Sequence, residues 1–386
     1  MNNTNGNTVV ILGAGATIGS EYTLCGQRLP GDRDFFSNPL VQNRVSKYPA
    51  LDTMLRFFRE VHQKDLVGVG LEQVWTFLDF SSRDLYQPLT DLAKDCKEWL
   101  KVTRKSVPKR DDDHCWTRYY RDDRTIPVPV DIDRKLHLLA GWDLRRLVSE
   151  IYGPIEPPAV NVYDLLLEKH HILPDSATTF ISLNYDLVLE RALDLVKAPW
   201  YYAQVSTTED RDQDGIQVIK PHGSLNWLFK GNVPSVSIST DYRGPVAHRS
   251  WVENRFREAL IIPPTHLKQP VNIPETQAPA TKELLAKLWK SMADALINAS
   301  RVFIIGYSFP STDHHLRTLF YRVNHKRAET KLKYREVRCC TWVPKNAARD
   351  EAKKLFEAAE GFFPTDTSRH FYKHKSFKDF VNGPSP

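Results

Sequence analysis

Residues 8–19 read TVVILGAGATIG, an apolar, β-branched run that stops at Gly13 and continues into a glycine-rich turn. The run predicts a short buried strand over Thr8–Leu12. A glycine-rich turn directly after such a strand can bring backbone N–H groups against a pyrophosphate at the start of a helix. We therefore predict that the turn binds the phosphates of a nucleotide, with Gly13, Ala14, Gly15, Ala16 and Thr17 as the binding residues.

The turn departs from the G-x-G-x-x-G fingerprint of dehydrogenases. The third glycine of that fingerprint would fall at position 18, which is Ile18, and Gly19 comes one place late. A glycine turn that binds no ligand is the alternative interpretation of this stretch taken alone.

Strand-like runs recur along the chain, with glycines, prolines or amphipathic helices between them. The further predicted strands are Thr178–Leu183, Ile216–Lys220, Ala259–Ile262, Val302–Ile305 and Arg338–Val343. The predicted helices are Leu187–Val196, Lys282–Ala299, His314–Val323 and Ala347–Ala358. Alternating strands and helices are typical of a parallel sheet covered on both faces. The predicted fold class is α/β, a doubly wound Rossmann-like parallel sheet.

The segment 41–171 has helical spacing instead, and we predict that it is a helical insertion within one domain that spans residues 1–386. One apolar face carries Leu51, Met54, Leu55, Phe58 and Val61, and another carries Leu71, Val74, Trp75 and Leu78. Lys105–Asp123 is predicted to be an exposed loop, and the Pro-rich run Gly153–Pro158 a return linker. After the sheet elements only a short C-terminal segment, Thr365–Pro386, is expected.

Composition limits the function classes. The 386 residues carry 53 Lys and Arg against 47 Asp and Glu, so the surface charge is mixed and direct nucleic-acid binding is not expected. The five cysteines form no C-x-x-C pair, which argues against a structural zinc or any other metal site. No stretch is apolar enough to span a membrane, and the first residues lack the features of a secretion signal, so we expect a cytoplasmic protein.

Polar side chains follow three of the later predicted strands. These are Asn184 and Asp186 after the second strand, His222 and Ser224 after the third, and Tyr307, Ser308 and Asp313 after the fifth, where Gly306 begins the loop and is a further candidate binding residue. The carboxyl ends of parallel strands share one edge of a sheet, where ligands bind, so these loops can converge with the glycine-rich turn. Amide, carboxylate, imidazole and hydroxyl groups suit a ligand rich in ribose hydroxyls and phosphate oxygens. Two alternatives stay open: Asn184 and Asp186 could cap the following helix, and His222 could be an ordinary loop histidine.

These four loops together resemble the sirtuin superfamily, and within it the prokaryotic sirtuin-like NAD hydrolases of antiviral defence. Gly13–Thr17 resembles the family's first glycine-rich loop, Asn184–Asp186 its N-[IY]-D motif, and Gly306–Ser308 its second nucleotide loop. His222-Gly223 resembles its catalytic H-G pair. Three further stretches fit the defence branch, namely Leu29–Phe36, Leu71–Val74 and Ile262–Thr265.

The resemblance implies an NAD glycohydrolase that cleaves the nicotinamide–ribose bond of NAD, its substrate, to nicotinamide and ADP-ribose. Asn184 would hold the ribose and an attacking water, and His222 would accept a proton. Gly13–Thr17 and Ser308 would bind the pyrophosphate, whereas Asp186 and Asp313 would hold ribose hydroxyls or orient their loops. Phe35 or Phe36 could wall off the nicotinamide, although a core role is equally open for both.

One departure from the deacetylating sirtuins is decisive for the expected activity. Those enzymes carry two C-x-x-C pairs on a small zinc module that helps to form the acyl-lysine cleft, and neither pair exists here. NAD cleavage without protein deacetylation is the expectation. The resemblance further implies an antiphage effector that depletes NAD, a homo-oligomer, and a HerA-type hexameric ATPase as partner, with the helical insertion as the contact surface.

Two rival functions remain at this stage. A non-catalytic NAD or ADP-ribose sensor, or a scaffold subunit of a defence complex, would keep the nucleotide loops but would not require His222. A Rossmann dehydrogenase would need an acidic residue on a second strand, and Asp32 and Asp34 lie near the right distance but in a Pro/Gly loop.

Overall fold

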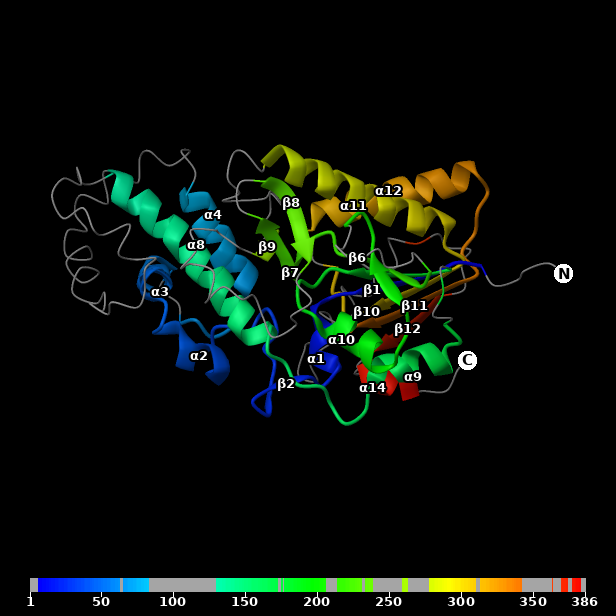
Figure 1. The fold of residues 1–386 in the computed structure, drawn as a ribbon, viewed down its shortest axis with the longest axis horizontal. Coiled ribbons are helices and arrows are strands. Elements are labelled where there is room, and N and C mark those ends of the chain that lie inside the picture. The colour runs from blue at the N-terminus through cyan, green and yellow to red at the C-terminus, as the bar shows by residue number, and fades with distance from the viewer. Residues whose placement is uncertain are drawn as a thin grey trace.

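The computed structural model describes residues 6–62, 65–82, 130–172, 175, 177–205, 214–230, 233–238, 259–262, 278–309, 313–341, 363, 369–373 and 377–382. The strands of its main sheet are β1 (Thr8–Leu12), β4 (Thr178–Ser182), β5 (Trp200–Tyr202), β6 (Ile216–Ile219), β10 (Arg301–Ile305), β11 (Glu336–Thr341) and β12 (Arg369–Lys373). Their order across the sheet is β12-β11-β10-β1-β4-β6-β5, and all neighbouring pairs are parallel (Figure 1). The predicted parallel α/β fold is confirmed.

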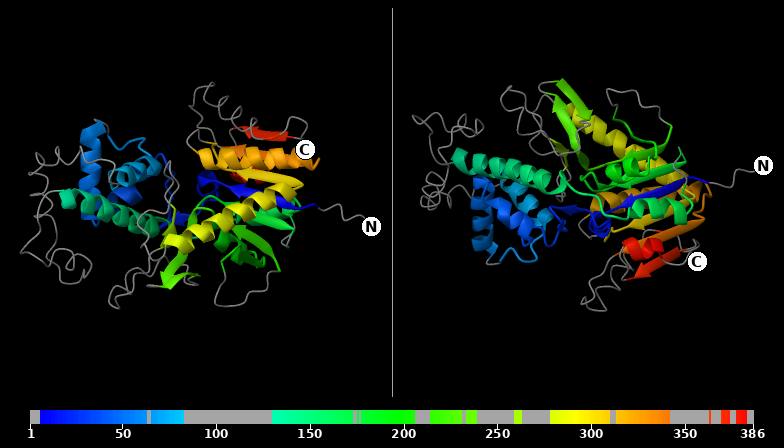
Figure 2. Two further views of the ribbon diagram at one scale, coloured as in Figure 1. Left: turned by 90° about the horizontal axis from the view of Figure 1, so that it is seen from above. Right: turned by 60° about the horizontal axis from the view of Figure 1, so that its bottom comes forward.

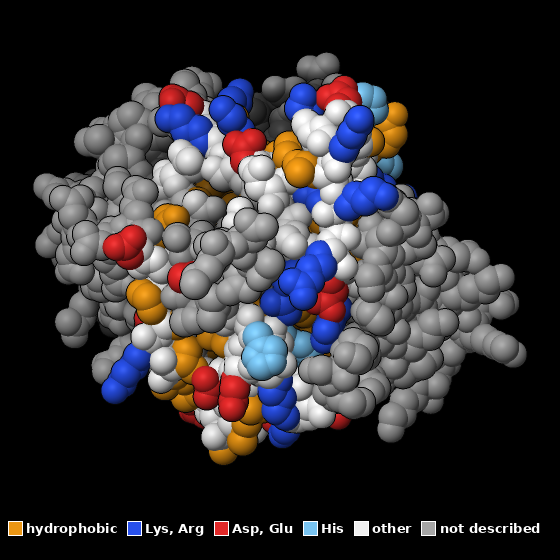
Figure 3. Space-filling model, turned by 90° about the vertical axis from the view of Figure 1, so that its right-hand side faces the viewer, with side chains coloured by type: hydrophobic (Ala, Val, Ile, Leu, Met, Phe, Trp, Pro, Cys, Tyr) orange, Lys and Arg blue, Asp and Glu red, His pale blue; other side chains and the backbone are white. Residues whose placement is uncertain are grey.

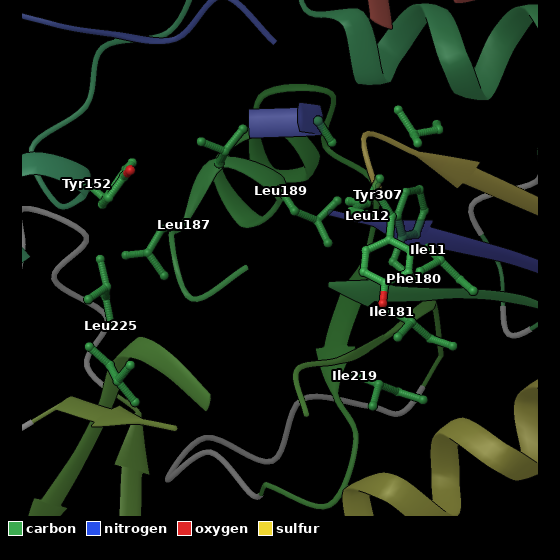
Figure 4. Packing of buried hydrophobic residues seen from close by; sticks show 14 of the residues in the cluster. Ile11, Leu12, Tyr152, Phe180, Ile181, Leu187, Leu189, Ile219, Leu225 and Tyr307 are labelled. Atoms are coloured by element: carbon green, nitrogen blue, oxygen red, sulfur yellow. The ribbon is translucent and has the colours of Figure 1, made fainter. Parts of the chain in front are cut away.

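The middle of the sheet is β1, whose bounds are those that the sequence predicts. It pairs in register with β10 on one side and with β4 on the other, and all five of its residues are buried. A strand that is buried on both faces needs an unbroken apolar run, which TVVIL supplies. Figure 4 shows Ile11 and Leu12 packed with Phe180, Ile181 and Ile219 of the neighbouring strands.

Helices cover both faces of the sheet, as a doubly wound fold requires. On one face lie α11 (Ala278–Asn298) and α12 (His314–Glu329), which pack on each other (Figures 1 and 2). The other face carries α1 (Ala14–Gly19), α9 (Val162–Lys169), α10 (Val188–Leu195) and α14 (Phe377–Asn382).

A second, antiparallel sheet lies beside the main one, in the order β8-β7-β9. Its strands are β7 (Gly223–Lys230), β8 (Val233–Ile238) and β9 (Ala259–Ile261). The expectation that Ala259–Ile262 joins the parallel sheet is wrong, because β9 pairs antiparallel with β7. Only Lys220, Pro221 and His222 separate β6 from β7, and a parallel partner needs a crossover of a dozen or more residues. The chain therefore leaves the main sheet at this point.

A block of four helices stands apart from the sheet in Figure 1, at the left of the view. It consists of α2 (Pro39–Val45), α3 (Pro49–His62), α4 (Leu71–Ser82) and α8 (Val130–Tyr152), with α8 packed on the other three. Eight residues of the predicted apolar faces of α3 and α4 are buried in its core, namely Leu51, Met54, Leu55, Phe58, Leu71, Val74, Trp75 and Leu78. The burial of Val61, the remaining predicted residue, lies outside what the structure describes. Helix α9 also falls within the predicted insertion but packs on α10 and α14 beside the sheet.

Two predicted segments are not described by the structure, and the C-terminal segment differs from its prediction. The loop Lys105–Asp123 and the helix Ala347–Ala358 lie outside the described residues. The C-terminal segment does more than the sequence indicates, because β12 extends the main sheet and α14 packs on α1 and α9. A separate two-stranded sheet is the hairpin of β2 (Thr23–Leu24) and β3 (Gln27–Arg28).

Surface and composition features agree with the mixed charge balance. Figure 3 shows Lys and Arg side chains interspersed with Asp and Glu on the face seen from the right of Figure 1.

Within the part of the chain that the structure describes, no helix is long and apolar enough to cross a bilayer. The same residues contain no group of three His, Cys, Asp or Glu side chains that could hold a metal ion. Cys339 and Cys340 lie in the core and form no disulfide, and burial raises the pKa of Cys339 above its ordinary value.

Candidate functional site

Four loops meet at one edge of the main sheet. They follow β10, β1, β4 and β6, which are consecutive neighbours in the strand order, so all four predicted loops converge as expected. The chain runs from β1 toward β4 on one side and from β10 toward β11 on the other. Strand order therefore reverses between β1 and β10, and ligands of open α/β sheets bind at such a switch point.

The loops after β1 and β10 touch through their backbones. Gly15 N–H donates to Gly306 O at 2.9 Å, and Gly13 N–H donates to Ile305 O at 2.9 Å. A Cβ on Gly13 would lie 2.6 Å from Gly306 O, and one on Gly306 would lie 2.0 Å from Ala16 N. Gly306 also has φ +68°, a backbone conformation that favours glycine. The glycines are therefore needed for the packing of one loop on the other.

This packing leaves fewer groups in the glycine-rich loop that could bind a phosphate. The N–H groups of Gly13, Gly15 and Ala16 already donate to backbone carbonyls, the last of them to Gly13 O. Thr17 is buried, and its hydroxyl is bonded within the protein. Ala14 is the exposed member of the segment. Phosphate binding by this loop stays a prediction, and Ala14 is the residue of the loop that remains accessible for it.

Asn184 joins the β4 loop to the glycine-rich loop. Its amide Nδ2 donates to Gly13 O and to Thr17 Oγ1, both at 2.9 Å. Because both N–H bonds are used, the amide orientation is fixed and Oδ1 is left as the group that can meet a ligand. Asn184 is half-buried. The alternative prediction that its side chain caps the following helix is wrong, because the side chain bonds to the glycine-rich loop instead.

Asp186 does cap a helix. Its Oδ1 accepts from Val188 N–H at the start of α10 at 3.0 Å, and its Oδ2 accepts from the Thr17 hydroxyl at 2.6 Å. Burial raises the pKa of this carboxyl, whereas the Lys220 charge and the two hydrogen bonds act in the opposite direction. With both oxygens engaged inside the protein, Asp186 orients the loops, which is one of its two predicted roles.

The loop after β10 is built in the same way. The Tyr307 hydroxyl donates to Asp313 Oδ2 at 2.9 Å, and Asp313 Oδ1 accepts from Leu316 N–H at the start of α12. Tyr307 and Asp313 are both buried, and burial raises the pKa of Tyr307 above its ordinary value. These two side chains support the loop from inside. Ser308 is exposed beside them, and its contact with a phosphate stays a prediction.

His222 sits in the turn that links the two sheets. Its carbonyl accepts from Ile262 N–H at 2.8 Å, and its ring lies edge-on to Trp289 with centroids 6.2 Å apart. Gly223 has φ +78°, and a Cβ there would lie 1.9 Å from Leu260 O. His222 is 6 % exposed, so its ring is buried in this turn.

Ser224 and the two phenylalanines are buried. Ser224 lies on β7 with no exposed surface, and its binding of the cofactor stays a prediction. Phe35 and Phe36 are 0 % and 2 % exposed and pack edge-on at 5.0 Å, which favours their core role.

Sequence reasoning missed the groups that connect the β4 and β6 loops. Leu225 N–H donates to Tyr185 O at 2.9 Å, and Lys220 Nζ donates to Asp186 O. The Tyr185 ring lies edge-on to Trp75 of α4 and to Tyr152 of α8, so the helical block contacts the same loop. A lysine at the end of an apolar strand is the signal that could have indicated Lys220, since lysine is rarely fully buried without a partner.

We predict that Gly306→Ala destabilises the protein by more than about 2 kcal/mol, because it combines left-handed strain with a backbone clash. Gly68→Ala is the matched control. Gly68 has φ +76° but nothing within 4 Å of an added Cβ, so strain alone should cost about 1 kcal/mol. Urea unfolding of both variants measures the difference. Equal costs would show that the two loops can move apart.

The fold and the site together define a class: a doubly wound α/β protein with polar loops gathered at its switch point, suited to a nucleotide. Residues 178–363, just under half of the chain, match the family model described as SIR2-like domain. The match includes the loops of Asn184, His222 and Gly306 but not the glycine-rich loop after β1. A SIR2-like domain is consistent with the use of NAD.

Two other comparisons add little. A search of the curated proteins found no match. A solved structure of a Sir2 variant, whose title names a deacetylated p53 peptide and 3'-O-acetyl ADP-ribose, aligns over 97 % of this chain and 91 % of its own. The two chains are 12 % identical, and the TM-score is 0.32. That score is too low to support a detailed comparison.

Proposed function

We propose that this protein is an NAD glycohydrolase that cleaves the nicotinamide–ribose bond to give nicotinamide and ADP-ribose. The observation that carries the proposal is the joining of three loops at the switch point. Asn184 is bonded to the glycine-rich loop, and its own loop is bonded to the turn that carries His222. The SIR2-like match over the last three of the four loops supports NAD as the ligand.

The chemistry needs positioning and charge stabilisation more than a strong acid. Nicotinamide leaves the ribose carbon with the electron pair of the N-glycosidic bond, and a water oxygen forms the new bond to that carbon. In this proposal Asn184 Oδ1 holds the water or a ribose hydroxyl, because its amide N–H groups are already committed. His222 accepts the proton that the water loses, so the products are nicotinamide, ADP-ribose and one proton.

A protein deacetylase would give a different result in the same assay. We expect the purified chain to release nicotinamide from NAD without an acyl peptide, and to leave acetyl-lysine peptides unchanged, because it lacks both C-x-x-C pairs. Nicotinamide and ADP-ribose are quantified by chromatography, and acetyl loss by mass spectrometry. Acetyl removal at the rate of nicotinamide release would refute this assignment.

We also predict that the reaction needs no metal ion. Within the described residues no three potential ligands lie together, and the sequence shows no ligand spacing elsewhere. Activity should be the same after EDTA treatment and desalting as before it. Loss of turnover with EDTA that zinc or magnesium restores would contradict the prediction.

One observation favours a second candidate, a non-catalytic NAD or ADP-ribose sensor. His222 is almost fully buried, and a sensor would not need this ring to reach a ligand. Calorimetry separates the two functions, since a sensor binds NAD with saturation and releases no nicotinamide. A dehydrogenase is disfavoured, because the carboxylates of Asp32 and Asp34 are engaged within the protein, accepting from Glu72 N–H at the start of α4 and from Gly31 N–H.

The biological proposal is that the protein depletes NAD in an antiviral defence system as a regulated cytoplasmic homo-oligomer. The helical block is the proposed contact surface for other copies or for a HerA-type ATPase, because it reaches the Asn184 loop through Tyr185. Light scattering after size exclusion, with and without such an ATPase, tests this. A strictly monomeric and constitutively active protein would defeat the hypothesis of regulated defence.

A further inference from the structure

A fully buried ion pair lies beneath the candidate site. Lys220 Nζ and Glu190 Oε1 are 2.7 Å apart, and neither side chain has exposed surface. Lys220 follows the last residue of β6, and Glu190 lies in the first turn of α10. The pair therefore joins the strand that leads to His222 with the helix that follows Asn184.

The pair belongs to a longer chain of hydrogen bonds. Lys220 Nζ also donates to Asp186 O, and the Tyr202 hydroxyl donates to Glu190 Oε1 at 2.7 Å. Asn226 Nδ2 in turn donates to the Tyr202 hydroxyl at 3.0 Å. Five elements, namely the β4 loop, α10, β5, β6 and β7, are linked through these bonds.

The network is close in sequence to both candidate catalytic residues. Lys220 precedes His222 by two residues, and its carbonyl accepts from Gly223 N–H at 3.0 Å to close the turn around His222. Pro221 restricts the backbone within that turn. On the other side, Asp186 follows Asn184 by two residues. The bond from Lys220 Nζ to Asp186 O is thus a direct link between the two loops, and Leu225 N–H to Tyr185 O is the second.

A buried ion pair is a weak source of stability, because desolvation of both charges offsets their attraction. Its directional hydrogen bonds can instead fix geometry. We propose that Lys220, held by Glu190, is a positioning residue that sets the place of His222 relative to Asn184 for NAD cleavage. This inference rests on the proposed NAD glycohydrolase activity.

The test uses a double variant, Lys220→Met with Glu190→Gln, because Lys220→Met alone would leave a buried carboxylate without its cation. The double variant keeps side-chain volume and keeps an acceptor for the Tyr202 hydroxyl. Glu336→Gln is the control. It removes the negative charge that pairs with Arg301, 3.2 Å away, and with Arg338, at the start of β10 and β11 and so at the opposite edge of the sheet.

We expect the double variant to unfold at about the denaturant midpoint of the wild type and to keep its KM for NAD. Its kcat should fall about a hundredfold, as a misplacement of about 1 Å can produce. The control should keep kcat. A folded double variant with wild-type kcat would overturn the inference.

A second measurement does not depend on turnover. In protein labelled with carbon-13 histidine, the ring signal of His222 is assigned by its loss in His222→Gln. It should move in the double variant and stay in place in Glu336→Gln. An unmoved His222 signal would overturn the positioning role, even if kcat fell. A wild-type protein that releases no nicotinamide would refute the proposed function instead, and the His222 signal would still decide whether Lys220 positions the ring.

Discussion

Replacement of His222 by alanine is expected to lower kcat for nicotinamide release by about a hundredfold to ten-thousandfold, the usual contribution of a positioned acid or base. The turn that carries the ring is held by backbone bonds, Gly223 N–H to Lys220 O and Ile262 N–H to His222 O. These bonds do not depend on the imidazole. The variant should therefore fold and still bind NAD.

The matched control for this variant is His325→Ala. His325 lies on the exposed surface of α12, where it faces Glu329, and it should keep full activity. Initial rates at saturating NAD are compared for the three proteins. Near-normal turnover by His222→Ala would eliminate the proposed proton acceptor.

Replacement of Asn184 by alanine is expected to lower kcat by about a hundredfold to a thousandfold and also to reduce stability. The catalytic loss follows from removal of a preorganised polar group at the reacting centre. The stability loss, roughly 1–3 kcal/mol, follows because Gly13 O and Thr17 Oγ1 lose the same donor.

Asn161→Ala separates these two effects. Asn161 also makes two side-chain bonds, accepting from Tyr163 N–H and donating to Ala192 O, but it caps α9 away from the four loops. It should lose similar stability and keep its kcat. If both variants lost activity in proportion to stability, Asn184 would have only a structural role.

Local pattern was sufficient for the strands with unbroken apolar runs. β1 has the predicted bounds, and β4, β6, β10 and β11 differ by one or two residues at their ends. The position of β9 was predicted, but its partner was not, because a short apolar run does not indicate whether it pairs parallel or antiparallel. That choice depends on the turn at Pro221-His222, which directs β7 out of the main sheet.

For the candidate site, it could be predicted from the sequence which loops come together. The residue types at the strand ends indicated where ligand groups gather, but not which of them face a ligand. Hydrogen bonds to helix starts and neighbouring loops occupy the polar groups of Asp186, Tyr307 and Asp313, and Ser224 is buried. Such assignments depend on contacts between residues far apart in the chain, as in the bond between Thr17 and Asp186.

Hydrolysis of NAD by this protein is measured by incubating the purified chain with NAD in oxygen-18 water. Free ADP-ribose in the same water serves as the exchange control. We expect nicotinamide and ADP-ribose in equal amounts, with one heavy oxygen in the ADP-ribose beyond the exchange control. Saturable binding of NAD with no nicotinamide above the blank would contradict it.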